Sequence, residues 1–284
     1  MYPEKLLIPL YRNLLRLSSG RGAHMLAKVD ASLLNFQREI SINSDGSVSI
    51  LLPPNPHFLG YLLKVHEPHV SQAITRLLNN GDVVVDVGAN IGYFSAWAVA
   101  AVGKQGQVFC LEPEIQNFKN LKTNCDWLKN RGFNCFAYQL GASSNNGKAE
   151  LRIHRHSTYH SIEDEYHNLD KVERMETINL VRLDEWAKSQ EIHKISLLKI
   201  DTEGHEPKVL EGASRLYESR AVNYTLLECR SEYISSYVDN FCKEFNLYQL
   251  VWDGYQWHDS TQQSLNSKAE CLLSVQPVSP GSLC

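Results

Sequence analysis

The sequence predicts an α/β fold with a mostly parallel sheet. Three observations lead to this prediction. From residue 81 onward, apolar strand-like segments alternate with helical segments, as in sheets that helices cover on both faces. A glycine-rich turn joins the first of these strands directly to a helix. The chain has 284 residues, 43% of them hydrophobic and 21% charged, so it can form one large globular domain or two small ones.

The composition also narrows the location and the partners of the protein. The net charge of −4 and the pI near 6.3 disfavour an electrostatic nucleic-acid binder. No apolar run approaches the roughly 18 residues of a transmembrane helix. The seven cysteines are odd in number, form no C-x-x-C pair and follow no signal-peptide core. We therefore expect a cytoplasmic protein with reduced cysteines, no nucleic-acid partner and no transmembrane segment.

The first 80 residues differ from the rest of the chain. Residues 1–17 carry apolar side chains at helical spacing, residues 40–52 alternate around a Ser-Asp-Gly turn, and residues 68–78 predict a helix. We interpret residues 1–80 as a helical and hairpin cap, or lid, that contacts the acceptor or a second copy of the chain in a homodimer. The alternative for residues 1–17 is a helix that lies on a membrane surface.

Residues 81–284 form the second predicted domain. Its strands are expected at residues 83–87, 107–111, 135–140, 195–200, 222–227, 248–252 and 271–275. Helices are expected at residues 91–102 and 114–129 and around residues 209–210, and a turn at Asp253-Gly254 separates the last two strands. The polar, aperiodic residues 154–170 predict a long loop after the third strand, and loops of this length are often functional.

The sharpest local signal is the segment DVGANIGYF at residues 86–94, where a strand turns into a helix. Gly88 permits a tight backbone turn, Asn90 tolerates a left-handed conformation, and Gly92 lets the helix start close to a ligand. In a parallel sheet such a turn lies at the carboxyl end of the strand, where these folds bind nucleotides. The alternative is a structural turn without a ligand.

Two acidic residues at strand ends distinguish between cofactors. Asp86 stands at the tip of the first strand, where a negative charge disfavours a diphosphate and favours an ammonium or sulfonium group. Glu112, followed by Pro113, ends the second strand, where a carboxylate can accept both ribose hydroxyls of an adenosine. NAD and S-adenosylmethionine share that ribose, but the spacing differs from the G-x-G-x-x-G turn of NAD-binding proteins. We therefore expect S-adenosylmethionine.

A second cluster of polar residues follows the fourth strand and comprises Asp201, Glu203, His205 and Glu206. If this strand neighbours the first one, the carboxyl ends of both strands face the same crevice, and these side chains converge beside the cofactor. Grouped acids perturb one another's pKa, which is a mark of functional sites. The alternative is a solvated loop in which an acid caps the next helix.

These segments resemble the FkbM family of S-adenosylmethionine-dependent methyltransferases. The resemblance rests on residues 86–94, on the Glu-Pro pair at 112–113 and above all on LKIDTEGHE at 198–206. Two shorter segments, VRLDE at 181–185 and LLE at 226–228, are also similar, so the resemblance spans roughly residues 65–275. Members of the family mostly methylate oxygen atoms of sugars, polyketides and other natural products.

The resemblance implies a Rossmann-like, seven-stranded methyltransferase sheet. It places the methionine part of the cofactor at the glycine-rich turn, the ribose on Glu112 and the adenine near Leu140. Acceptor specificity is expected from the residues before 60 and from the loop at 154–170. The cofactor-binding residues implied in this way are Asp86, Gly88, Ala89, Asn90, Gly92, Tyr93, Glu112, Pro113, Gly141, Ala142 and Asp201.

Methyl transfer to a hydroxyl requires a group that removes the hydroxyl proton. We expect His205 to be this base because a histidine titrates near neutral pH, and Asp201 and Glu203 are the other catalytic candidates. A carboxylate acceptor needs no base. It needs a cationic or hydrogen-bonding pocket, for which the candidates are Lys199, Arg155, His156 and Arg230.

We assign no metal ligand from the sequence. The histidines of the predicted loop match no familiar ligand spacing; they are His154, His156, His160 and His167. The alternative is a divalent ion held by Asp201, Glu203 and Glu228, which would help to deprotonate a hydroxyl.

The predicted function is therefore S-adenosylmethionine-dependent O-methyl transfer to a hydroxyl or carboxylate of a small molecule, sugar, natural product or short peptide. Two alternatives come from other classes of protein. The first is an NAD-dependent oxidoreductase, which the turn after Asp86 disfavours. The second is a non-catalytic scaffold that retains the fold, which the intact turn and the acids around it disfavour.

Overall fold

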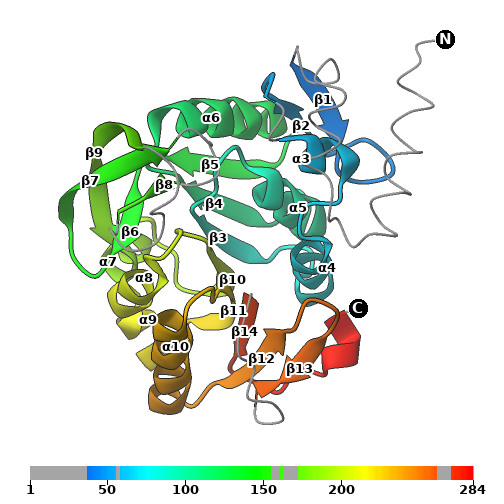
Figure 1. The fold of residues 1–284 in the computed structure, drawn as a ribbon. Coiled ribbons are helices and arrows are strands. Elements are labelled where there is room, and N and C mark those ends of the chain that lie inside the picture. The colour runs from blue at the N-terminus through cyan, green and yellow to red at the C-terminus, as the bar shows by residue number, and fades with distance from the viewer. Residues whose placement is uncertain (1–36, 56–57, 155–159, 163–171, 261–269, 284) are drawn as a thin grey trace.

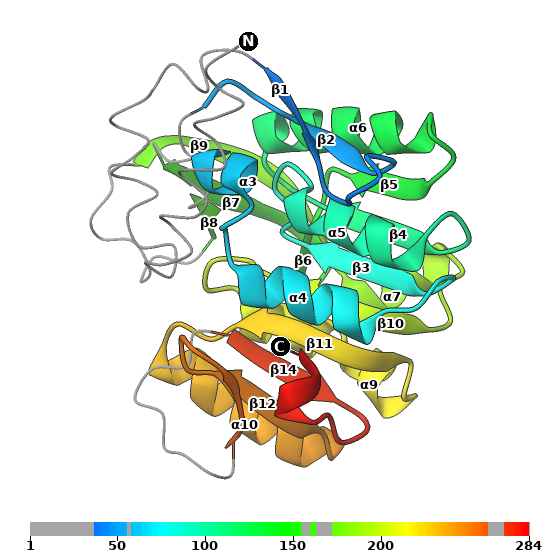
Figure 2. The ribbon, with the colours of Figure 1, turned by 90° about the vertical axis from the view of Figure 1, so that its right-hand side faces the viewer.

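A computed structural model of the protein shows a sheet of eight strands between two layers of helices (Figures 1 and 2). It describes residues 37–55, 58–154, 160–162, 172–260 and 270–283. The predicted α/β class is confirmed. Across the sheet the strands are β13 (Trp257–Asp259), β12 (Tyr248–Trp252), β14 (Glu270–Ser274), β11 (Val222–Glu228), β10 (Ile195–Ile200), β3 (Val83–Val87), β4 (Gln107–Leu111) and β5 (Asn134–Tyr138).

The five strands from β11 to β5 are parallel, and β14 runs antiparallel to both β11 and β12. The sheet contains all seven expected strands and one more. The extra strand is β13, which pairs with β12 after a tight turn. In this turn the Asp253 carboxylate accepts hydrogen bonds from the backbone N–H groups of Tyr255 and Gln256, and Gly254 has a φ of 99°. This geometry reverses the chain within a few residues.

Helices cover both faces because the central strands are apolar on both sides. Val84 packs into the core under one layer and its neighbour Val85 into the core under the other. The first layer contains α4 (Pro68–Leu77), α5 (Tyr93–Val102) and α6 (Ile115–Lys129), and the second contains α7 (Leu183–Ser189), α8 (Glu206–Gly212), α9 (Ser214–Glu218) and α10 (Glu232–Phe245). Within the described part of the chain, no helix has the length and apolar composition needed to cross a membrane.

The predicted N-terminal hairpin is present as β1 (Arg38–Ser41) and β2 (Ser49–Leu52). Asn124 of α6 holds β2 in place: its amide nitrogen donates to the carbonyls of Leu51 and Ile91, and its oxygen accepts from the N–H of Leu51 at 2.7 Å. The short helix α3 (Leu59–Leu63) follows and shares one core with α4 and α5. The helix predicted at residues 1–17 lies outside the described residues, and the division at residue 80 stays a prediction.

A second sheet, not expected from the sequence, interrupts the alternation of strands and helices. Its order is β6 (Gly141–Ser143), β9 (Val172–Arg182), β7 (Gly147–His154) and β8 (His160–Ser161). Ile178 is the one residue of β9 that is fully buried, so this strand lacks a clear apolar alternation. Strand β8 falls within residues 154–170, where we expected a loop, and most of that segment lies outside the described residues.

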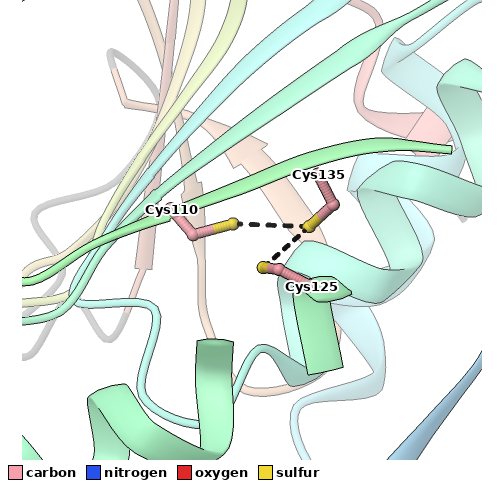
Figure 3. Close-up of side chains that lie close together, drawn as sticks. All are labelled: Cys110, Cys125 and Cys135. Carbon is pink, nitrogen blue, oxygen red and sulfur yellow. Dashed lines mark hydrogen bonds between the residues drawn. The ribbon is translucent and has the colours of Figure 1, made fainter. Parts of the chain in front are cut away.

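Three cysteines meet between α6 and the strands β4 and β5 (Figure 3). The Sγ atom of Cys135 lies 3.0 Å from that of Cys125 and 3.9 Å from that of Cys110. They pack among hydrophobic side chains of the same core, where a reduced thiol behaves as a small apolar group. The described cysteines are all buried; they are Cys110, Cys125, Cys135, Cys229, Cys242 and Cys271.

Candidate active site

A cavity of about 160 Å³ opens at the carboxyl ends of β3, β4 and β10. It is lined by the turn after β3, the end of β4, the start of β6, the loop after β10 and residues just before α4. Two predicted site residues, Asp86 and Gly92, do not line it. The predicted site residues that line the cavity are Gly88, Ala89, Asn90, Tyr93, Glu112, Pro113, Gly141, Ala142, Asp201, Glu203 and His205.

The turn after β3 packs closely against the ends of the two neighbouring strands, β4 and β10. The N–H groups of Gly88 and Ala89 both donate to the carbonyl of Leu111, at 2.9 and 3.0 Å. Gly88 has a φ of 77°, and a Cβ at this position would lie 1.8 Å from the carbonyl oxygen of Asp201. Asn90 is also left-handed, with a φ of 52°. This turn therefore needs glycine at position 88, and it places Gly88, Ala89 and Asn90 in the wall of the cavity.

Glu112 is a buried carboxylate at the end of β4 that faces the same turn. It accepts hydrogen bonds from the N–H groups of Asn90 (2.8 Å) and Glu114 (3.0 Å). Burial raises its pKa to about 8, although these two backbone donors oppose the shift. Because both donors fix its orientation, the carboxylate is held ready to accept hydrogen bonds from a ligand in the cavity.

Asp86 lies beneath the cavity rather than in its wall. Its Oδ2 accepts a hydrogen bond from Ser95 of α5 at 2.6 Å, and its Oδ1 lies 3.8 Å from Nζ of Lys199. Burial raises the pKa of Asp86 to about 6. Lys199 does line the cavity, and its Nζ donates to Asp201 at 2.9 Å. Asp86 therefore lies next to the cavity-lining Lys199, and its contact with a cationic ligand stays a prediction.

The loop after β10 takes its shape from Glu206, whose side chain is fully buried. One Glu206 oxygen accepts hydrogen bonds from both the N–H and the hydroxyl of Thr202, and the carboxylate also accepts from the N–H of Gly204. Within this loop Glu203 is left-handed, with a φ of 52°. Glu206 thus has a structural role, and it directs Asp201 and Glu203 to the cavity.

Arg230 lies between two carboxylates at the edge of the cavity. Its guanidinium contacts Glu228, and its Nη1 lies 3.5 Å from Oε2 of Glu203. Burial raises the pKa of Glu203 to about 8 and that of Glu228 to about 11; Asp201 adds to both shifts and Arg230 opposes them. Oxygens of Asp201, Glu203 and Glu228 lie within 4.8 Å of one another, so this group has the donors for a divalent cation.

His205, the predicted base, is directed toward β6. The side chain is buried, and its Nε2 lies 2.9 Å from the hydroxyl oxygen of Ser143. Ser143 directly follows Gly141 and Ala142, the residues that the sequence resemblance assigns to the adenine. His205 lines the cavity together with Asp201 and Glu203, but its ring is held on the β6 side.

Sequence reasoning missed a contribution from the residues before α4. Tyr61, His66 and Glu67 all line the cavity, and the ring of Tyr61 stacks on that of Tyr93 with centroids 4.4 Å apart. The sequence carries one signal for them: an ionisable pair at 66–67 stands directly before a helix that begins with proline. The candidates Arg155 and His156 lie outside the described residues.

The chain is similar in sequence to known proteins. Residues 86–245, more than half of the chain, match a family described as the methyltransferase FkbM domain. Hexuronic acid methyltransferase AglP of Haloferax volcanii is 28% identical over 177 residues, which cover 58% of this chain and 64% of that protein. The chain thus spans less than two thirds of the length of this relative.

Two solved structures of methyltransferases are also similar. A methyltransferase FkbM from Methylobacillus flagellatus KT has 16% identity and a TM-score of 0.47, over 77% of this chain and 53% of that one. A SAM-dependent O-methyltransferase from Thermotoga maritima has 12% identity and a TM-score of 0.41, over 81% and 75%.

Proposed function

The chain belongs to the FkbM methyltransferase family, and from this premise we propose that it transfers a methyl group from S-adenosylmethionine to an oxygen atom of a sugar-like acceptor. The observation that carries the proposal is the cavity itself. Its walls bring together the glycine-rich turn after β3, the fixed carboxylate of Glu112 and the polar loop after β10. Membership of a methyltransferase family decides against the NAD-dependent oxidoreductase that the sequence left open.

The residues present fit S-adenosylmethionine in chemistry. The backbone of Gly88, Ala89 and Asn90 and the side chain of Tyr93 would hold its methionine end, and Glu112 would accept the ribose hydroxyls. The start of β6, at Gly141 and Ala142, would hold the adenine. Asp201, whose pKa is lowered by Lys199, keeps a negative charge in the wall, which suits a ligand that carries a positive charge. When bound, this cofactor supplies a methyl group on a sulfonium, a leaving group that needs no further activation.

The sugar-like acceptor is proposed from the relative AglP, whose name states a hexuronic acid. A sugar presents both hydroxyls and, in a uronic acid, a carboxylate. The polar side chains that line the cavity can form hydrogen bonds with hydroxyl and carboxylate groups. A small-molecule acceptor is therefore favoured over a peptide. A homodimer stays a prediction.

Asp201, Glu203 and His205 all line the cavity, and their catalytic roles stay predictions. A divalent metal is less favoured by the geometry. Arg230 already contacts Glu203 and Glu228, two of the three carboxylates that would be its ligands, and a metal would have to displace this guanidinium. Full activity after exhaustive chelation is the expected outcome.

The cofactor proposal is tested by isothermal titration calorimetry with S-adenosylhomocysteine, the product form of the cofactor, and with NAD. We expect binding of S-adenosylhomocysteine and none of NAD. The variant Glu112→Gln should weaken that binding by about tenfold or more, because an amide offers one oxygen to the two ribose hydroxyls where the carboxyl group offers two.

The matched control is Glu244→Gln, which removes an exposed carboxyl of α10 and should bind as the unmodified protein does. Binding of S-adenosylhomocysteine that is absent at millimolar concentration would overturn the cofactor proposal and favour the scaffold alternative. If the Glu112→Gln variant bound S-adenosylhomocysteine as tightly as the unmodified protein, the cofactor proposal would stand, but Glu112 would not be one of the residues that bind the cofactor.

A further inference from the structure

The segment before α4 brings to the cavity a histidine that the sequence did not single out. The ring of His66 packs against aromatic rings from α3 and α5: its centroid lies 4.5 Å from that of Tyr61, 5.7 Å from that of Phe94 and 6.1 Å from that of Tyr93. About a third of the side chain, 33%, remains exposed, and His66 is among the residues that line the cavity. The ring is therefore held in place and still accessible to a ligand.

The backbone around His66 has two unusual residues. Lys64 has a φ of 55° and Glu67 a φ of 39°, a left-handed conformation that non-glycine residues rarely adopt. The N–H groups of Lys64 and Val65 donate to the carbonyls of Tyr61 and Gly60, which fixes the turn. Strained backbone of this kind persists where the surrounding structure holds it, and it is common at functional sites.

The charges around His66 suit a proton acceptor. Four charged groups act on its ring: Glu67, whose Oε2 lies 3.9 Å from Nε2, and Asp201 raise its pKa, whereas Lys199 and Arg230 lower it. Burial is the largest effect, and the pKa lies below the usual 6.5. The imidazole is therefore neutral at pH 7 and able to take a proton, and the two nearby carboxylates would stabilise the imidazolium that forms.

The other candidate bases in the cavity are already engaged. Asp201 is paired with Lys199, which holds its pKa below the usual range and makes it a weak base. Glu203 contacts Arg230. The Nε2 of His205 lies beside the Ser143 hydroxyl on the adenine side of the proposed cofactor site. His66 instead stands next to Tyr93 and Phe94, at the end of the turn assigned to the methionine part.

The same contacts bear on the acceptor. Within the part of the chain that the structure describes, the lysine and the arginine that line the cavity both contact carboxylates: Lys199 pairs with Asp201, and Arg230 pairs with Glu203 and Glu228. An acceptor carboxylate would have to compete for these cations with acids that belong to the protein. A neutral hydroxyl meets no such repulsion.

Resting on the proposed function, we propose that the acceptor group is a hydroxyl and that His66 takes its proton. In this step the acceptor O–H bond breaks and the proton passes to a ring nitrogen of His66. The oxygen forms a bond to the methyl carbon, and the electron pair of the broken C–S bond stays on sulfur. The products are a methyl ether, S-adenosylhomocysteine and an imidazolium that later releases its proton to solvent.

The first test measures the pKa of His66 by NMR in two complexes that differ by the charge on sulfur. The histidine resonances are assigned from the spectra of His66→Gln and His205→Gln. If His66 faces the reacting group, its pKa is lower in the complex with S-adenosylmethionine than in that with S-adenosylhomocysteine, by about 1 pH unit, because like charges disfavour protonation. His205 serves as the internal control and should differ less. Equal values for His66 in both complexes would overturn the proposal.

The second test uses two matched acceptors, methyl glucoside and methyl glucuronide. We expect methyl products that survive mild alkali, as ethers do, and an alkali-labile methyl ester would overturn the hydroxyl assignment.

His66→Gln should lower kcat by about 100- to 10,000-fold and leave the affinity for S-adenosylhomocysteine unchanged. His193→Gln, at an exposed position, is the control for loss of a histidine. Imidazole added to His66→Gly should restore part of the rate, which a purely structural role would not allow.

The possible results distinguish a failure of the role proposed for His66 from a failure of the proposed methyltransferase function. A His66→Gln variant with the wild-type rate and pH profile would overturn the role of His66 alone. A wild-type protein that binds neither form of the cofactor would overturn the proposed function first. The melting temperature of each variant shows whether a lost rate reflects lost folding, and the NMR comparison decides the role of His66 even where a given sugar is not accepted.

Discussion

At the scale of single residues, Gly88 sets the shape of the cavity. Its left-handed backbone and its close approach to the Asp201 carbonyl allow β3 and β10 to end side by side. The neighbouring Asn90 accepts the same left-handed conformation, which asparagine tolerates better than most residues. The turn and the loop after β10 are thus packed against each other through backbone atoms.

Gly88→Ala should therefore be more harmful than an ordinary glycine substitution. The new Cβ would lie 1.8 Å from the Asp201 oxygen, so the loop after β10 must move. We expect a loss of about 2–4 kcal/mol in the free energy of unfolding, from backbone strain plus steric overlap, and a weaker affinity for S-adenosylhomocysteine. Chemical denaturation and calorimetry measure the two effects.

Gly81→Ala is the matched control. Gly81 has a φ of 92°, but a Cβ there meets nothing within 4 Å. This variant should lose only about 1 kcal/mol, from the strain of a left-handed alanine. If both variants were equally stable, the close approach at Gly88 would carry no energetic weight.

At the scale of elements, α6 connects the N-terminal hairpin to the sheet. Its predicted apolar face packs on β5, while Asn124 on the same helix satisfies backbone groups of β2 and of the turn before α5. Sequence periodicity identified the helix, but a buried asparagine on it reads in sequence as an ordinary polar residue. Its partners lie 73 and 33 positions away in the chain, so only the tertiary structure reveals them.

Asn124→Ala should loosen the hairpin. It removes three hydrogen bonds and leaves backbone groups of Leu51 and Ile91 without this partner. We expect a loss of about 2–3 kcal/mol and faster proteolysis of residues 38–52, measured by denaturation and by limited digestion. Asn120→Ala, at a half-buried position of the same helix where the side chain bonds only the Gln116 carbonyl of that helix, should change neither the stability nor the digestion. Equal digestion of the two variants would contradict the proposed role of Asn124.

The second sheet shows where sequence patterns fail at this scale. Strands β7 and β9 pair over eight residues, yet β9 exposes most of its side chains and so has no apolar alternation to detect. By contrast, the central strands are apolar on both faces, and all seven were found within a few residues of their ends. The strands that could be predicted are those whose side chains are buried, whereas the number of residues over which two strands pair made no difference.

At the scale of the whole molecule, buried carboxyls around one cavity make stability depend on pH. Burial raises the pKa of Glu112 and of Glu203 from 4.5 to about 8. A carboxyl with a raised pKa in the folded state contributes stability that is present at low pH and is lost as pH rises through the folded value. His66, whose pKa is lowered, acts in the opposite direction, but only below pH 6.5.

The unliganded protein should therefore become less stable between pH 6.5 and 8. Each of these carboxyls contributes at most about 1.4 kcal/mol per pH unit to the loss. Glu112→Gln should flatten the decrease, because an amide does not titrate, whereas the exposed control Glu244→Gln should retain it. Melting temperatures measured across this range provide the check, and an identical pH slope in all three proteins would contradict the assignment.

The α/β class, the turn after β3 and the two acidic segments at strand ends could be predicted from the sequence, because they follow from backbone preferences and from periodic burial along neighbouring residues. The tertiary structure was needed to show that Asp86 lies beside Lys199, that the ring of His205 lies against Ser143, and that His66 lines the cavity. Each of these outcomes is a contact between side chains far apart in the chain, and packing, not local sequence, decides which side chains meet.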